Sequence, residues 1–235
     1  MKYKAVIFDM DGLLLDTERI ALSIFVESCR ENNFEPDINV YYKCIGTTSY
    51  ATREILMKGY GNDFPFEAIS ALWKKKYENE VFNRPVPLKP GALDLLRRLE
   101  KEGTKRVVVT STDRELAIRK LTNAQIVHFF GFVLGRDQVL QGKPNPEIYL
   151  TACRDLREDP ADCLALEDSD NGVLAAYHAG LEIIQVPDLV EPSPTVRALG
   201  HRIVKSLIEV TPILDMEINS GFPLPYQAPG QASRE

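Results

Sequence analysis

The sequence lacks the features that would place it in several specialised classes of protein. No apolar run approaches the roughly 20 residues that a membrane-spanning helix needs, and the run nearest the N-terminus ends at Asp9. We therefore expect no membrane span and no signal peptide. The four cysteines form no Cys-x-x-Cys pair, so we expect reduced, buried thiols and a cytoplasmic protein.

The sequence also lacks an excess of basic residues and any internal repeat. Its formal net charge is -6, which argues against the basic face that bulk nucleic-acid binding requires. An anionic ligand would have to be bound by local cations, because the overall field opposes it. A hydrophobic content of 44% and a charged content of 26% are those of an ordinary soluble globular protein.

What the sequence does contain is an alternation of short apolar runs and helical patterns. A chain of 235 residues has room for one α/β domain and a smaller one. Alternating strands and helices predict an α/β fold with a parallel, doubly wound sheet. The expected strands are residues 5–8, 106–109, 132–134, 163–166 and 182–186, with a short last one at 202–204, and the expected helices beyond residue 90 are 91–102, 113–124, 146–156 and 170–179.

The segment 17–86 differs from the rest because it contains helical patterns and no convincing buried strand. Helices are expected at about 17–31, 48–59 and 65–80, with Asp16 or Thr17 as the first N-cap. Since residues 5–8 belong with the sheet, this all-helical segment is an insertion between two strand–helix units. The expected division is a core of residues 1–16 plus 87–220, a helical domain at 17–86, and an irregular tail at 221–235.

Two carboxylates, Asp9 and Asp11, follow the first strand directly. Open α/β sheets bind ligands at the carboxyl ends of their strands, which is where this pair lies. Neighbouring like charges repel unless a cation lies between them or one of them carries a proton. The pair therefore indicates a metal site or a nucleophile beside a general acid. The alternative is that Asp-x-Asp-Gly forms an ordinary turn after a strand.

Polar residues also follow the second and third strands. Thr110-Ser111-Thr112 precedes a helix N-terminus, where hydroxyl and free N–H groups bind anions; the alternative is simple N-capping by Thr112 or Asp113. After the third strand, prolines fix the backbone around Lys143. Its ammonium would neutralise the carboxylates and pair with a substrate oxyanion, unless it is a solvated surface lysine.

The fourth strand ends in the acidic run Glu167-Asp168-Ser169-Asp170-Asn171-Gly172. A buried strand normally carries fewer carboxylates at its tip, and hard oxygen ligands of this kind suit Mg²⁺. Taken alone, the run is equally an acidic helix N-terminus that the helix dipole favours. The order of all four groups, each at the carboxyl end of a strand, is far more specific than any one of them.

In this order and spacing, the chain resembles the haloacid dehalogenase superfamily of phosphotransferases. The motifs that carry the resemblance cover the whole core: Asp9-Met10-Asp11-Gly12 with Asp16-Thr17, Thr110-Ser111, Lys143-Pro144, and Glu167-Asp168 with Asn171-Gly172. The resemblance implies a Rossmann-like sheet with strand order 5-4-1-2-3. It also implies a helical cap inserted after the first strand, which matches the insertion at 17–86.

The resemblance further implies the role of each core residue. Asp9 would be the nucleophile that forms an aspartyl-phosphate, and Asp11 the general acid and base. Thr110 and Lys143 would hold the phosphoryl group. Such a kit is sufficient, because phosphoryl transfer depends mainly on positioning and charge stabilisation.

A magnesium ion is the implied cofactor. Its ligands would be Asp9, the backbone carbonyl of Asp11, and Asp168. Glu167 would be either a further direct ligand or a residue that supports the ligands.

The second aspartate also separates branches of the family, because the dehalogenase members lack it. The sequence is similar to the branch that contains β-phosphoglucomutase and sugar-phosphate phosphatases. That mutase carries a histidine where Ala21 stands and an arginine where Ser49 stands. We therefore expect a phosphatase that acts on a small phosphorylated metabolite. A phosphosugar mutase is the alternative, followed by a non-catalytic sensor or binding protein on the same fold.

Substrate choice is expected to rest with the cap, which should open and close on hinges near residues 16–17 and 84–87. The tip of the segment 44–49 is expected to enter the site, with Lys43 or Arg53 as further contacts; the alternative is an ordinary helix connection. No nucleic-acid or membrane partner is expected, and the chain should be a monomer or a weak homodimer. The candidate substrate-binding residues are Gly46, Thr47, Thr110, Ser111, Lys143 and Asn171.

Overall fold

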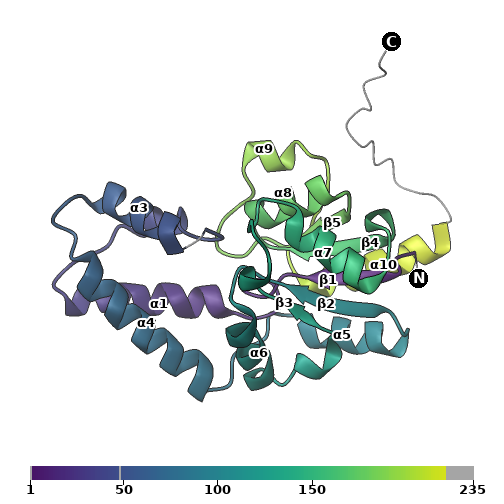
Figure 1. Ribbon diagram of the computed structural model, residues 1–235, viewed down its shortest axis with the longest axis horizontal. Helices are drawn as coiled ribbons and strands as arrows, with labels where there is room; N and C mark the ends of the chain where they lie inside the picture. Colours follow the sequence, from purple (N-terminus) through teal and green to yellow (C-terminus); the bar gives the residue numbers. More distant parts are fainter. Residues whose placement is uncertain (1, 48, 221–235) are drawn as a thin grey trace, which may run out of the picture.

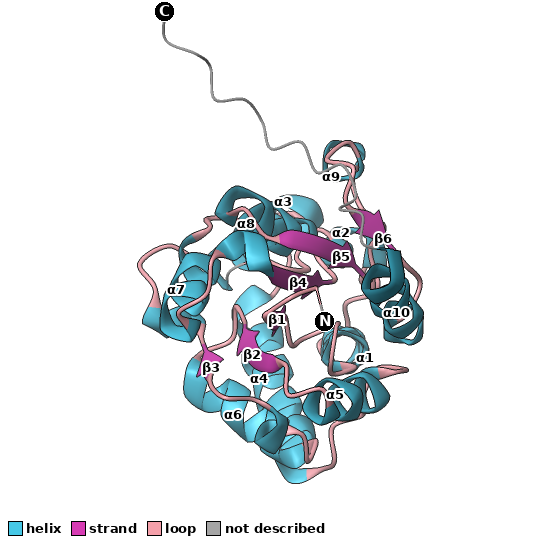
Figure 2. Cartoon of the chain, turned by 90° about the vertical axis from the view of Figure 1, so that its right-hand side faces the viewer, coloured by secondary structure: helices cyan, strands magenta, loops and turns pink. Residues whose placement is uncertain are grey.

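The computed structural model describes residues 2–47 and 49–220. Its centre is a six-stranded sheet in the order β3-β2-β1-β4-β5-β6, with every neighbouring pair parallel (Figure 2). The predicted doubly wound α/β fold is therefore confirmed, and β6 extends the implied 5-4-1-2-3 order by one strand. The strands are β1 (Ala5–Phe8), β2 (Lys105–Val109), β3 (Val133–Leu134), β4 (Cys163–Glu167), β5 (Glu182–Gln185) and β6 (Arg202–Ile203).

Successive residues of β1 point to opposite faces of the sheet, as alternation along a strand requires. Val6 and Phe8 pack into one hydrophobic cluster, Ala5 and Ile7 into another, and all four are fully buried. A continuous apolar strand is stable here because helices cover both faces. The first cluster includes residues of α5 (Ala92–Lys101), α6 (Arg114–Asn123) and α10 (Val210–Ser220), and the second includes residues of α7 (Glu147–Leu156), α8 (Asp170–Ala179) and α9 (Pro194–Arg197).

The segment between β1 and β2 is helical and stands to one side of the sheet domain (Figure 1). It has a hydrophobic cluster of its own, in which the ring of Phe25 lies 4.9 Å from that of Tyr41 and 5.1 Å from that of Trp73, measured between centroids. This confirms the expected helical insertion. Its helices are α1 (Thr17–Glu31), α2 (Ile38–Tyr42), α3 (Ser49–Tyr60) and α4 (Phe66–Asn83).

The differences from the predicted elements lie in the shortest ones and at element ends. Helices α1 and α8 have the predicted bounds, whereas β3 has two residues where three were expected. Helices α2 and α9 were not predicted, because five and four residues are too few for an apolar period to show. Helix α10 was missed as well. Short 3₁₀ helices complete the described chain: η1 (Val127–Phe129), η2 (Arg136–Gln138), η3 (Pro160–Asp162) and η4 (Leu207–Glu209).

Two linkers join the helical segment to the sheet domain, and they run side by side. The Asp16 N–H donates to the carbonyl of Pro87 at 2.9 Å, and the Lys89 N–H donates to that of Leu14 at 2.9 Å. The linkers lie next to Asp188, whose buried carboxylate forms ion pairs with Arg19 of α1 and with Lys89. The two linkers thus run together where the helical segment joins the sheet domain.

Other expectations concern the whole chain. The four cysteines are free and buried, as expected of reduced thiols. Among the described residues, none of the helices combines the length and apolar character that crossing a membrane would take. The expected irregular tail, 221–235, lies outside the described residues.

Candidate active site

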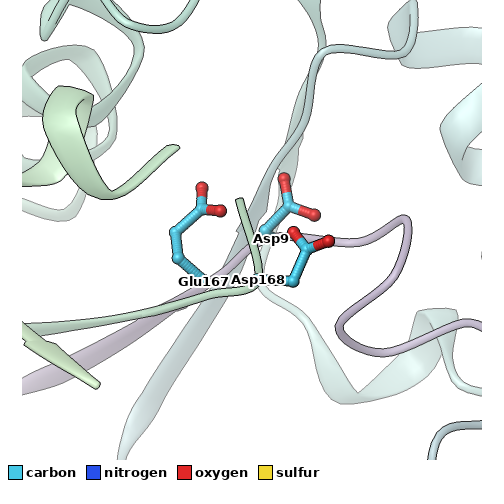
Figure 3. A group of neighbouring side chains, drawn as sticks. All are labelled: Asp9, Glu167 and Asp168. Carbon is cyan, nitrogen blue, oxygen red and sulfur yellow. The ribbon is translucent and has the colours of Figure 1, made fainter. Parts of the chain in front are cut away.

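Three carboxylates meet at the carboxyl ends of the two central strands. The pairing of β1 with β4 sets Phe8 beside Leu166, so the residues that follow each strand are neighbours. Asp9, Glu167 and Asp168 are all buried, and one oxygen from each lies within 4.8 Å of the other two. Figure 3 shows the carboxylates of Asp9 and Asp168 close together, with that of Glu167 set to the other side.

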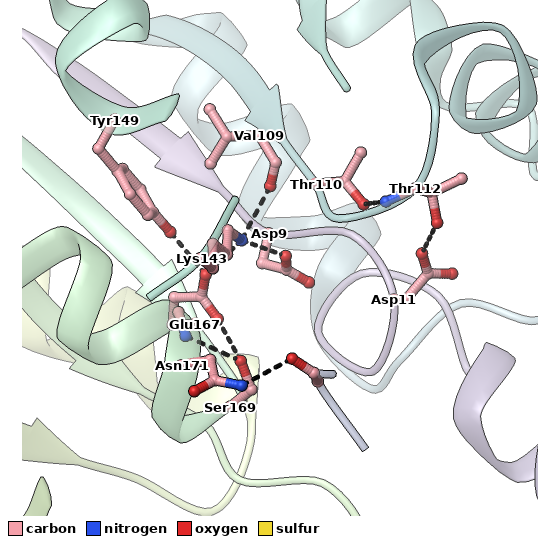
Figure 4. A network of polar contacts seen from close by, with 12 residues as sticks. Asp9, Asp11, Val109, Thr110, Thr112, Lys143, Tyr149, Glu167, Ser169 and Asn171 are labelled. Atoms are coloured by element: carbon pink, nitrogen blue, oxygen red, sulfur yellow. Dashed lines mark hydrogen bonds and ion pairs between the residues drawn. The ribbon is translucent and has the colours of Figure 1, made fainter. Parts of the chain in front are cut away.

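Lys143 ties two of these carboxylates together (Figure 4). Its ammonium donates to Asp9 Oδ1 at 2.6 Å, to Glu167 Oε1 at 2.6 Å and to the carbonyl of Val109 at 3.2 Å. The hydroxyl of Tyr149 also donates to Glu167 Oε1, at 2.6 Å. Burial favours the neutral amine, but Asp9 and Glu167 raise the pKa of Lys143 well above its ordinary value. Lys143 is thus a fixed, buried cation and not a solvated surface lysine.

Glu167 is packed as closely as it is bonded. A Cβ placed on Gly172 would stand 2.0 Å from the carboxyl atoms of Glu167, so only glycine fits at this position of α8. Ser169 donates to Glu167 Oε2 at 3.3 Å. Because one oxygen already accepts two short hydrogen bonds and the group is wedged against α8, Glu167 is better placed to support Lys143 than to bind an ion.

The positive charge near Asp9 and Asp168 does not balance the negative charge of their carboxylates. Burial raises the pKa of Asp9 to about 8; Lys143 opposes this rise, and the charges of Glu167 and Asp11 add to it. Burial, followed by the charges of Asp9 and Glu167, raises the pKa of Asp168 well above its ordinary value. A cation between Asp9 and Asp168 would remove this penalty, so the two residues suit a metal ion electrostatically as well as chemically.

Asp11 points away from this pair and is held by three donors. Thr17 donates to its Oδ1 at 2.6 Å, Thr112 to its Oδ2 at 2.7 Å, and Lys120 to its Oδ1 at 2.8 Å. Burial would raise the pKa of Asp11, but the charge of Lys120 and these hydrogen bonds outweigh it and lower the pKa. The motif of Asp9 and Asp11 is therefore no ordinary turn, since each carboxylate has buried ionic partners.

Sequence reasoning missed Lys120, which is only 4% exposed. It belongs to the inward face of α6 together with Ala117 and Leu121, at the i, i+3 and i+4 spacing of one helix face. A lysine in an otherwise apolar stripe was the available signal. Its ammonium lies 5.1 Å from the ring centroid of Tyr77 in α4, so it bridges the sheet domain and the helical segment.

The predicted hydroxyl-bearing residues Thr110 and Ser111 directly follow β2. Thr110 is buried and its Oγ1 accepts the N–H of Thr112 at 3.1 Å, whereas Ser111 is exposed. Asp113 stands at the N-cap of α6 but makes no side-chain cap bond. Simple capping therefore does not explain these residues, and both Thr110 and Ser111 line a cavity of about 370 Å³ with Asp9 and Lys143.

The tip of the segment 44–49 reaches the same cavity. Gly46 and Thr47 line it, and Asn171 Nδ2 donates to the carbonyl of Gly46 at 2.8 Å. Gly46 has a φ of +71°, and a Cβ added there would stand 3.2 Å from Cβ of Ser169. The connection is thus a close contact between the helical segment and α8, and a larger residue would disturb it.

Of four further positions that the sequence had singled out, three lie away from the cavity. Lys43 is exposed, and Arg53 pairs with Glu67 and with the ring of Phe66, so neither lines the cavity among the described residues. The carbonyl of Ala21 accepts the indole N–H of Trp73 at 3.0 Å, inside the helical segment. The side chain of Ser49 lies outside the described residues.

The model of the family described as haloacid dehalogenase-like hydrolase matches residues 6–186, which is most of the chain. The chain belongs to this family. As a haloacid dehalogenase-like hydrolase it is an enzyme.

Two curated relatives and one solved structure are similar to this hydrolase over most of its length. It is 31% identical over 201 residues to a protein of Bacillus subtilis that carries the name "Putative phosphatase YhcW", covering 85% of this chain and 90% of that protein. It is 30% identical over 184 residues to the phosphorylated carbohydrates phosphatase of Thermotoga maritima, covering 77% and 83%. The sequence is also 26% identical to CbbY from Rhodobacter sphaeroides, whose crystal structure was determined in complex with xylulose-(1,5)bisphosphate. The two structures match with a TM-score of 0.69, covering 88% of this chain and 96% of that chain.

Proposed function

We propose that this hydrolase is a magnesium-dependent phosphatase that cleaves a small phosphate monoester, a sugar phosphate or a related metabolite, through an aspartyl-phosphate on Asp9. One observation carries the proposal. Asp9 is held at Oδ1 by Lys143 and stands beside Asp168 and Thr110 at the wall of a cavity of about 370 Å³. A fixed carboxylate that faces a cavity with a lysine and hydroxyl groups around it suits in-line attack on phosphorus.

The residues that would hold magnesium are Asp9, Asp168 and the backbone carbonyl of Asp11. Their hard oxygen atoms are the ligands that Mg²⁺ prefers. Burial and the neighbouring carboxylates raise the pKa values of Asp9 and Asp168, so a cation there would favour both as carboxylates. When bound, the ion would neutralise charge on the phosphoryl oxygens. Glu167 would act through Lys143 and not as a ligand, since both Lys143 and Tyr149 already donate to its Oε1.

The reaction has two steps in which the chain's own groups do the work. In the first, a carboxylate oxygen of Asp9 attacks phosphorus, the bond from phosphorus to the ester oxygen breaks, and Asp11 gives a proton to the leaving alkoxide. Against the effect of burial, Lys120 lowers the pKa of Asp11 in the free site, so Asp11 would gain this proton as the anionic substrate enters, because added negative charge favours the neutral form. In the second, water attacks phosphorus, Asp11 takes the water's proton, and inorganic phosphate leaves Asp9 as a free carboxylate. Lys143, Thr110 and Ser111 would hold the phosphoryl oxygens in both steps.

The relatives support the substrate class. The Thermotoga maritima enzyme is named for phosphorylated carbohydrates, and CbbY was crystallised with a sugar bisphosphate. Hydrolysis fits better than mutase chemistry, because no histidine lines the cavity among the described residues and Ala21 lies outside it. A cytoplasmic location and a monomeric or weakly dimeric state stay predictions.

The test is magnesium-dependent phosphate release from a panel of phosphorylated sugars, nucleotides and small acids. We expect release that chelation with EDTA abolishes and that Asp9→Asn lowers by about 10⁴-fold or more, because no covalent intermediate can form. Interconversion of one sugar phosphate into another with little release would identify a mutase instead. Absence of both activities in the unaltered chain would favour a non-catalytic protein.

A further inference from the structure

Part of the cavity wall is formed by residues that have no direct role in the proposed chemistry. We call it the leaving-group wall, because a leaving group attached to the phosphoryl group would extend toward it. It is built by α1 and α4 of the helical segment and by α6 of the sheet domain. Its residues are Glu18, Tyr77, Phe82, Leu116 and Lys120.

Lys120, the lysine of this wall, is already paired within the protein and is not available to bind a charged group of a substrate. Lys120 is buried and donates to Asp11 at 2.8 Å, and its other neighbour is Tyr77. Lys74 also reaches the cavity, but its side chain is 77% exposed and lies 3.9 Å from Glu78. An exposed, partly compensated ammonium contributes little in water. The wall thus has no free buried cation among the described residues.

Glu18 is the group on this wall that is left without a bond. No donor reaches its carboxylate among the described residues, although its neighbours Thr17 and Arg19 both have partners. The point where a Cβ on Gly12 would stand is 3.4 Å from Glu18 Cγ and 2.3 Å from Asp168 Oδ2, so Glu18 borders the reacting end of the cavity. Burial, with the charge of Asp11, raises the pKa of Glu18 to about 7.

Glu18 is half-buried on the wall of the cavity and has no protein donor among the described residues, so its carboxylate is free to accept a hydrogen bond from a bound molecule. An acidic residue in the first turn of α1 interacts favourably with the helix dipole, but an outward-facing one would do so without this crowding. A hydroxyl group of a bound leaving group would give the carboxylate the donor that it lacks. A carboxylate at the same place would add to the charges of Asp11, Glu18 and Asp168.

We propose that Glu18 is a specificity-determining residue that accepts a hydrogen bond from a hydroxyl of the leaving group and excludes leaving groups with a carboxylate in its place. This inference rests on the proposed phosphatase function and narrows its substrates to esters of uncharged polyols and sugars. Phe82 and Leu116 complete the selection, because their apolar side chains suit the C–H faces of such a group. Sites that bond a hydroxyl discriminate strongly against analogues that cannot supply it.

Matched pairs of esters test the inference, since each pair differs in one carbon of the leaving group. They are glycerol 3-phosphate with 3-phosphoglycerate, erythritol 4-phosphate with 4-phosphoerythronate, and glucitol 6-phosphate with 6-phosphogluconate. We expect the uncharged member to have the higher kcat/KM by about tenfold or more in the pairs that are turned over. Glu18→Gln should reduce that ratio about tenfold by improving turnover of the acid, and Glu18→Lys should reverse it.

Glu27→Gln is the matched control, because it removes the same charge from an exposed position of the same helix. It should leave every ratio unchanged. Circular dichroism and the thermal midpoint of each variant show that it is folded. Preference of the unaltered enzyme for the acids, or an unchanged ratio in both Glu18 variants, would overturn the inference while leaving a phosphatase. Lack of phosphate release from every ester would overturn the proposed function itself.

Discussion

The sheet domain and the helical segment are held together by different physical means. At the sheet domain's site, Lys143, Asp9, Glu167 and Tyr149 form one buried network of short hydrogen bonds and ion pairs. The helical segment is built on aromatic packing, with Phe25 contacting Tyr41, Tyr60 and Trp73. The ionic network fixes the positions of charged groups in the sheet domain. The aromatic packing fixes the shape of the helical segment.

The difference suggests a division of labour. Buried ionic networks are costly unless every group is satisfied, so they tolerate little change and suit chemistry that does not vary. A segment with its own apolar cluster can change its surface residues, or tilt on its two linkers, without disturbing that network. The segment reaches the site through Gly46, Glu18 and Tyr77, which are the positions where selectivity would be set.

The strongest test of this comparison is to break the ionic network. Lys143→Met should lower phosphate release by about 10³-fold and destabilise the fold by roughly 3–5 kcal/mol, because Asp9 and Glu167 would be left buried without a counter-charge. Kinetics and urea unfolding measure the two effects. Lys105→Met, which removes an exposed lysine paired with Glu158, should cost less than about 1 kcal/mol. Equal costs for both lysines would contradict the special status of the network.

The next test addresses the aromatic cluster. Phe25→Ala should destabilise the helical segment by about 3–5 kcal/mol, because a fully buried ring leaves a cavity. Amide hydrogen exchange should quicken in α1, α3 and α4 and stay slow in β1, β2 and β4. Phe8→Ala, in the cluster beneath the sheet, should instead quicken exchange in the strands. Parallel loss of protection in both regions after Phe25→Ala would show that the two fold as one unit.

A pH-dependent test sharpens the comparison at Glu18, where the two regions meet. The pKa of Glu18 is about 7 in the folded protein against an ordinary 4.5, so the folded state holds its proton over a range in which the unfolded state has lost it. The contribution of Glu18 to stability should therefore fall as pH rises from about 4.5 to 7 and then level off, while the raised pKa values of Asp9 and Asp168 extend the total loss to higher pH. Glu18→Gln, which resembles the protonated form, should escape the part of this loss that comes from Glu18.

The measurement is urea unfolding in EDTA at pH 4.5 and pH 8. At pH 8 Glu18→Gln should be more stable than the unaltered chain by about 1–3 kcal/mol, and at pH 4.5 the two should be nearly equal. Glu27→Gln should show no such pH dependence. A stability gain that is the same at both pH values would indicate better packing and not relief of a buried charge.

The smallest expected effect is at the contact between the two regions. Asn171→Ala removes the hydrogen bond to the carbonyl of Gly46, which should weaken closure by about 1 kcal/mol and raise KM roughly fivefold with kcat nearly unchanged. Asn83→Ala, which removes an exposed bond to Asn79 within α4, is the control and should leave both constants as they are. A fall in kcat with constant KM would place Asn171 in the chemical step.

Much of the core site could be predicted from the sequence, because a parallel sheet brings the carboxyl ends of its strands to one edge. Asp9, Thr110 and Asp168 follow β1, β2 and β4, so their proximity comes from sheet register alone. The order of the residues also carried the resemblance to the family, which the match over residues 6–186 confirms. The individual roles of these residues stay predictions.

What the sequence by itself determined was the fold class, the helical insertion and the positions of the chemistry-bearing side chains along the strands. Only the tertiary structure decided which side chains meet between elements. It turned Glu167 toward Lys143 and Tyr149, paired Lys120 with Asp11, and left Glu18 without a donor in the part of the chain that the structure describes. The physical reason is that strand register follows from local backbone geometry, whereas contacts among α1, α4 and α6 depend on how whole helices pack, which no local pattern encodes.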